Sequence, residues 1–252
     1  MELHSGGLMD DFWTRLRRET RREHNFSNTL VNLTLPFALS DRSIYAKALE
    51  SFYYVYSTVE EEFDRQRRNF PKIGALYFEE LRRKKSFERD LQFFLGENWR
   101  QKLQGPSPTV AQYVEHIKQV SSSKPWLILS YVITLYMALF RGGSILRKIL
   151  VVSMALDKES GEGVAIYDFS SSISDTEAFF KKYIETVNAL TLSEEQKDEV
   201  IEEKRAIFLW NDAIFNEVRS GPYYKTVLWR FFWSLVFVVF VVIFFLKKKN
   251  YW

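Results

Sequence analysis

Residues 131–143 read YVITLYMALFRGG, an apolar run that ends in two consecutive glycines. The stretches before and after it both have helical patterning, so Gly142 and Gly143 are expected in the interior of one long helix, residues 126–154. Each glycine costs a helix interior about 1 kcal/mol relative to alanine. A cost of this size indicates that something approaches the backbone closely at the pair. A flat, bulky ligand lying across the helix would explain it, and so would a neighbouring helix.

The composition favours a helical protein with one domain and short connections. Of the 252 residues, 46% are hydrophobic and 17% are aromatic, whereas only 10 are glycine and 6 are proline. The absence of cysteine from the sequence excludes disulfides, thiolate metal ligands and cysteine nucleophiles. A net charge of +3 does not indicate a nucleic-acid partner.

Apolar periodicity predicts an all-α domain over residues 11–220, preceded by a flexible N-terminus at residues 1–10. Asp10 or Asp11 is placed to cap the first helix. The expected helices are residues 12–31, 43–68, 87–94, 109–120, 126–154, 175–190 and 193–219.

A long apolar segment, residues 226–246, follows the helical domain. It is long enough to cross a bilayer if the Arg230 side chain extends toward the interface. Trp229 and Trp233 lie near one end, as interfacial anchors do. A buried core helix would also be apolar, but it should show a polar face, which this segment lacks. We therefore expect a tail-anchored protein whose helical domain faces the cytosol.

The residues after the apolar segment are compatible with insertion into either of two membranes. Residues 247–252 form a short tail that begins with three lysines. The endoplasmic reticulum membrane is the first expectation. The mitochondrial outer membrane is the alternative, because a basic tail also suits that address.

Several segments, in order along the chain, resemble the heme oxygenase family. LRRETRREH (residues 16–24) is similar to the family's first helix, and His24 falls at the position of its iron-ligating histidine. The resemblance covers roughly residues 12–218. It implies a heme-oxygenase-like multi-helix fold plus one C-terminal transmembrane helix, since animal members are commonly anchored in this way. Further matching segments are YYVY (53–56), EEE (60–62), YFEEL (77–81), FERDL (87–91), GEG (161–163), VIEE (200–203) and FLWN (208–211).

The resemblance implies an enzyme that oxidises heme to biliverdin, carbon monoxide and ferrous iron. Heme would be both substrate and cofactor. Oxygen would be consumed, and NADPH–cytochrome P450 reductase would supply the electrons from NADPH. A heme site needs a flat apolar slot, an axial ligand and cations for the two propionates.

The axial ligand is expected to be His24, on a face shared with Leu16, Thr20 and Asn28 at helical spacing. A lone inward histidine is more often a structural core residue, and the family register favours the ligand role here. Asn28 is expected to accept a hydrogen bond from the other ring nitrogen, more weakly than the glutamate that the family usually has there.

The propionates are expected to meet cations of the first helix. Arg17 and Arg21 match the family's lysines that have this role, and arginine pairs with carboxylates at least as well. Taken without the resemblance, the arginines clustered here favour a solvated helix face over an edge that binds phosphate or carboxylate. Tyr136 and Phe208 complete the residues that the resemblance places at the heme.

On the distal side the family pattern Gly-Asp-Leu-Ser-Gly-Gly is replaced by ALFRGG, residues 138–143. The resemblance assigns Gly142 and Gly143 to a backbone that lies close over the porphyrin. The aspartate that holds a proton-delivering water network is replaced by Leu139, a change shared with insect-type heme oxygenases. Other polar positions of that network are kept, at Tyr56, Tyr113 and Asn211.

Further departures predict that heme is held less firmly and that oxygen is activated with less control. Leu135 stands where the family has an arginine of the distal network, and Phe180 and Ile184 stand at two later propionate cations. A catalytically degenerate protein that binds or senses heme is therefore the alternative to an active enzyme. A membrane-anchored helical scaffold that binds no heme is the third hypothesis.

Overall fold

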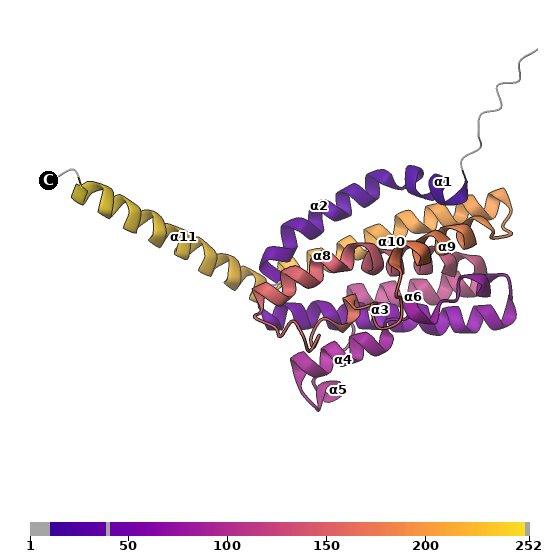
Figure 1. Ribbon diagram of the computed structural model, residues 1–252, viewed down its shortest axis with the longest axis horizontal. Coiled ribbons are helices and arrows are strands. Elements are labelled where there is room, and N and C mark those ends of the chain that lie inside the picture. Colours follow the sequence, from indigo (N-terminus) through magenta and orange to yellow (C-terminus); the bar gives the residue numbers. More distant parts are fainter. Residues whose placement is uncertain (1–10, 39–40, 250–252) are drawn as a thin grey trace, which may run out of the picture.

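A computed structural model describes residues 11–38 and 41–249, which form helices joined by short loops (Figure 1). The all-α class is confirmed. The predicted N-terminus, residues 1–10, lies outside the described residues, as do the Asp10 cap and the last three residues of the tail. The α-helices are α1 Phe12–Glu19, α2 Arg21–Ala38, α3 Arg42–Asn69, α4 Lys84–Leu95, α5 Trp99–Lys102, α6 Pro108–Ser123, α7 Ile128–Tyr131, α8 Met137–Ser153, α9 Thr176–Asn188, α10 Glu194–Ser220 and α11 Pro222–Lys249. Short turns of tighter or wider helix are η1 Ile73–Leu76, η2 Glu79–Leu81, η3 Pro125–Leu127, η4 Val132–Tyr136 and η5 Ala165–Tyr167.

The first predicted helix begins as expected but is divided at Thr20. Asp11 caps it, because its carboxylate accepts a hydrogen bond from the Thr14 backbone N–H at 2.7 Å. The Thr20 hydroxyl donates to the Leu16 carbonyl at 2.8 Å, and the Thr20 backbone leaves the helical region. The single helix predicted over residues 12–31 is therefore wrong. The shared face is interrupted as well, since Leu16 and Thr20 are buried whereas His24 is exposed.

The core lies between α3, α6, α7 and α10, and α2 lies along α10 on the outside of the bundle (Figure 1). Large apolar and aromatic side chains fill this interior. Fully buried examples come from each of the four helices and include Val55, Tyr113, Ile128 and Ile207. This packed core holds α2 and α8 in position, with one face of each helix exposed.

The predicted helix over residues 126–154 exists, but it is not uniform. Its middle, η4, is a π-helical segment that leads from α7 into α8. Widening of this kind frees backbone carbonyls from the helical ladder. The Tyr56 hydroxyl donates to the Leu135 carbonyl at 2.8 Å, and the Tyr183 hydroxyl donates to the Val132 carbonyl at 3.4 Å. The helix is long and apolar enough to cross a membrane, but most of that apolar stretch is buried in the protein core.

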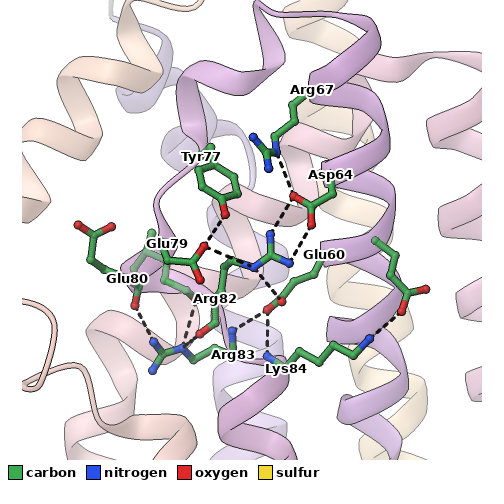
Figure 2. Close-up of polar contacts among 11 residues, drawn as sticks. Glu60, Asp64, Arg67, Tyr77, Glu79, Glu80, Arg82, Arg83 and Lys84 are labelled. Atoms are coloured by element: carbon green, nitrogen blue, oxygen red, sulfur yellow. Dashed lines mark hydrogen bonds and ion pairs between the residues drawn. The ribbon is translucent and has the colours of Figure 1, made fainter.

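A buried ion network fixes the start of α4 against α3 (Figure 2). The Glu60 carboxylate accepts hydrogen bonds from the backbone N–H groups of Arg83 at 2.6 Å and Lys84 at 3.0 Å. It therefore caps α4 from a neighbouring helix, where the helix dipole favours a negative charge. Arg82 links this cap to the next turn of α3, since its guanidinium contacts Glu60 at 3.2 Å and Asp64 at 2.9 Å.

The predicted apolar segment, residues 226–246, falls within α11, which extends away from the helical body (Figure 1). The large apolar side chains described on α11, from Leu228 to Phe240, are exposed. No carboxylate occurs on this helix, and lysines occupy its end.

Candidate active site

The two glycines of α8 have different surroundings. A Cβ atom added at Gly143 would lie 3.0 Å from Cδ1 of Tyr167 in η5, so this glycine allows a close approach within the protein. A Cβ atom added at Gly142 would meet nothing within 4 Å. Gly143 therefore fits the packing explanation of the glycine pair. Gly142 borders open space, and it fits the explanation that a ligand approaches the helix.

Gly142 belongs to an exposed apolar face, which we call the open face of α8: Ala138, Gly142, Ile145 and Ile149. These positions are three or four residues apart, so they form one stripe along the helix. Ile145 is 63% exposed and Ile149 is 41% exposed. Side chains of this size are seldom left together in water without a binding role. Leu139 lies beside the stripe and is half-buried against the core.

The structure brings three of the predicted site residues together on α2 and α10. The His24 ring is exposed on α2 and meets the Phe208 ring edge-on, with 5.8 Å between centroids and 88° between planes. The Asn28 amide nitrogen lies 3.3 Å from Nδ1 of His24. In this orientation Asn28 donates to Nδ1. The amide turned by 180° would instead accept from Nδ1–H and leave the Nε2 lone pair free.

The electrostatic surroundings keep His24 neutral. Partial burial lowers the pKa of His24 from its ordinary value, and the positive charges of Lys204 and Arg17 lower it further. A neutral imidazole is the form that binds a metal ion. Arg17 and Arg21 are exposed, and no ion pair engages either of them within residues 11–38 and 41–249. Both guanidinium groups therefore remain available for a carboxylate.

Lys204 was not predicted as a site residue. It lies on α10 one turn before Phe208 and is only 8% exposed. Burial and the charge of Arg17 lower its pKa to about 8. The sequence does contain a signal for it, because Val200, Lys204 and Phe208 are spaced by four residues. A lysine on a buried apolar stripe is unusual enough to mark a site.

The predicted polar positions lie in the interior behind α8. The Tyr113 hydroxyl and the Asn211 side-chain oxygen are buried and, within the described part of the chain, lack a hydrogen-bond partner. Unpaired buried polar atoms of this kind have free capacity to hydrogen-bond a water molecule. Burial raises the pKa of Tyr113 and of Tyr56 well above the ordinary value, so both hydroxyls keep their protons.

Tyr136, which the resemblance placed at the heme, lies within the aromatic core. It is 2% exposed, and its ring centroid is 6.2 Å from that of Tyr56. Its hydroxyl is buried without a partner among the described residues. Tyr136 thus extends the polar interior and does not lie on the open face of α8.

A cavity of about 360 Å³ lies elsewhere, between α4 and the loop before η5. Its lining is largely polar and contains none of the predicted site residues. The lining residues are Arg89, Asp90, Gln92, Phe93, Glu97, Glu162, Gly163 and Ala165.

Comparison with known proteins covers most of the chain. A family model described as heme oxygenase matches residues 10–217. Heme oxygenase 1 of Nostoc sp. is 34% identical over 209 residues, which is 82% of this chain and 85% of that protein. Heme oxygenase 2 of Macaca fascicularis is 33% identical over 178 residues, covering 70% of this chain and 55% of that protein.

Solved structures agree with the sequence relatives. The crystal structure of heme oxygenase-1 from Synechocystis sp. in complex with heme has a TM-score of 0.80 and 32% identity, and covers 90% of this chain and all of that one. Heme oxygenase from Leptospira interrogans has a TM-score of 0.75 and 31% identity, covering 82% of this chain. On the sequence match and the shared fold together, the chain belongs to the heme oxygenase family of heme-degrading enzymes.

Proposed function

We propose that the protein oxidises heme to biliverdin, carbon monoxide and ferrous iron, using oxygen and electrons from NADPH–cytochrome P450 reductase. The open face of α8 carries this proposal, because its apolar side chains and the free space at Gly142 suit a flat apolar ligand. Heme, when bound, supplies the iron centre at which oxygen is activated. The protein's own residues bind the substrate, orient it and arrange its water.

In this proposal His24 would hold the heme iron, and the open face of α8 would lie against the apolar part of the macrocycle. The edge of the Phe208 ring limits rotation of the imidazole. Asn28 accepts from Nδ1–H once its amide is turned, which leaves Nε2 to bind iron. A neutral amide oxygen is a weaker acceptor than a carboxylate, so the electron donation from His24 is modest.

Proton delivery is the weaker part of the proposed site. Leu139 has no polar atom, and Tyr56 is already engaged with the Leu135 carbonyl. The Tyr113 hydroxyl and the Asn211 oxygen are the groups left to hold ordered water. We therefore expect slower turnover, or a mixture of products, compared with a site that contains a distal acid.

The test is a hemin titration of the purified full-length chain in detergent, followed by reductase and NADPH. Binding should produce a Soret band that is lost in His24→Ala, and biliverdin should then accumulate. A Soret band without biliverdin would reject the enzyme and support the second candidate, a protein that binds or senses heme. Leu139 favours this candidate, since it removes the proton-handling side chain. A hemin spectrum that does not change when the protein is added would support the third hypothesis, a membrane-anchored scaffold that binds no heme.

We also propose that α11 anchors the protein in a membrane, with the helical domain in the cytosol. The endoplasmic reticulum is preferred, with the mitochondrial outer membrane as the alternative. The 28 residues of α11, at about 1.5 Å each, span roughly 42 Å, which exceeds the apolar thickness of a bilayer. The exposed apolar side chains from Leu228 to Phe240 support this placement. An anchor would also hold the domain on the same membrane as a membrane-bound reductase.

A further inference from the structure

Lys204 is a buried cation without a counter-ion. No hydrogen bond or ion pair engages its ammonium group within the residues that the structure describes, although the residue is only 8% exposed. Burying an unpaired charge is costly, and folded proteins retain such a group mainly where a partner binds.

The groups whose charges act on Lys204 are basic. Arg17 of α1 and His24 of α2 both interact with it electrostatically, and both interactions are repulsive when the groups are charged. Neighbouring carboxylates are engaged elsewhere. Glu203 accepts hydrogen bonds from His116 at 2.9 Å and from Tyr131, and Glu202 pairs with Arg205. Glu23 of α2 contacts Arg205 at 3.9 Å. Lys204 and Arg17, which repel each other, are therefore together complementary to an anion.

We propose that Lys204 binds a carboxylate of the tetrapyrrole from the α10 side, together with Arg17 of α1, and so acts as a positioning residue for the substrate. This inference rests on the proposed function, because it takes heme as the occupant. Arg17 can approach a carboxylate from the exposed side, and Lys204 from the buried side. Two cations on different helices fix a carboxylate more firmly than two on one flexible surface, because the buried side chain has few alternative positions.

A consequence concerns the orientation of the macrocycle. The apolar part of heme has nearly fourfold symmetry, so the carboxylates would be the groups that distinguish one orientation of the macrocycle in the site from another. A cation at the buried end of the site selects one orientation.

The test is Lys204→Met in the full-length protein, compared with wild type for hemin and for hemin dimethyl ester. We expect the variant to bind hemin about tenfold more weakly, because a charge-assisted contact is lost. The ester has no free carboxylates, so its affinity should be equal in both proteins. The apo-variant should unfold at a higher temperature than the apo-wild type, because an unpaired buried charge has been removed.

Two variants serve as controls. Lys197→Met removes the same charge from α10 at the surface, where Lys197 pairs with Glu194 at 2.7 Å, and it should leave both affinities unchanged. Lys204→Arg keeps the cation and should recover part of the hemin affinity. Equal weakening of hemin and ester, or unchanged hemin binding in Lys204→Met, would overturn the assignment. A wild-type protein that binds no hemin at all would reject the proposed function itself.

Discussion

At the scale of single residues, the two adjacent glycines of α8 have different roles, one in packing and one at the proposed ligand site. Gly143 is needed for contact with Tyr167, whereas Gly142 borders open space. The sequence predicted a close approach at the pair without assigning the two roles. The difference depends on η5, a turn far along the chain, and no local pattern reports where that turn packs.

This difference gives a matched pair of substitutions. Gly142→Ala should stabilise the apo-protein by up to about 1 kcal/mol, since alanine favours a helix and its methyl group meets no neighbour. Gly143→Ala should be less stable than Gly142→Ala by about 1–2 kcal/mol, because the methyl group crowds Tyr167. Urea denaturation followed by circular dichroism measures both. Equal stability of the two variants would contradict the packing role of Gly143.

Leu139 provides the corresponding test of the chemistry. Leu139→Asp places a carboxylate beside the open face of α8, where it can hold water and pass protons. We expect the yield of biliverdin per heme to rise several-fold in an assay with reductase and NADPH. Leu139→Asn, which is polar but not acidic, is the control. An aspartate variant no better than the asparagine one would show that proton supply does not limit the reaction.

At the scale of elements, helix positions followed from local spacing, and two departures came from tertiary contacts. The break at Thr20 depends on a hydroxyl that bonds to its own helix, and threonine occurs in many helices without this effect. The π segment η4 depends on Tyr56 and Tyr183, which come from α3 and α9. Neither partner is visible in the sequence of residues 132–136.

Asp90 joins two elements and makes their contact sensitive to pH. It is fully buried on α4 and accepts hydrogen bonds from the backbone N–H groups of Ala165 at 2.8 Å and Ile166 at 2.9 Å. Burial raises the pKa of Asp90 to about 6. Because the folded pKa exceeds the unfolded value, the stabilising contribution is complete below about pH 4 and is lost as the pH rises through 6.

We predict a change in the free energy of unfolding on the order of 3 kcal/mol, relative to Asp90→Asn, whose side chain cannot titrate. Between about pH 4 and about pH 7, the wild type should lose this amount relative to Asp90→Asn. Urea midpoints across that range provide the measurement. Parallel curves for the two proteins would exclude Asp90 as the titrating group.

At the scale of the whole molecule, the sequence predicted the class and the order of helices, and it identified the pair formed by His24 and Asn28. It placed Tyr136 at the heme, whereas the structure places this side chain in the aromatic core, 2% exposed. It gave no role to Lys204, which we propose as a positioning residue because α1 and α10 pack together. Residues that act through partners on other helices were the hardest to predict.

The anchor can be tested on the same scale. The full-length chain, expressed in cells, should remain in the membrane pellet after alkaline carbonate extraction, and a version ending at residue 220 should be released. Protease added to intact microsomes should digest the helical domain. Release of the full-length chain by carbonate would show that α11 does not span the bilayer.

The open face of α8 has a consequence for the stability of the heme-free protein in the cell. Ile145 and Ile149 are exposed whenever heme is absent, and apolar surface of this kind promotes self-association. Product release returns the chain to that state at the end of every cycle. Scarcity of heme would therefore reduce the amount of folded, unaggregated protein, so that its abundance would follow the supply of the molecule it consumes.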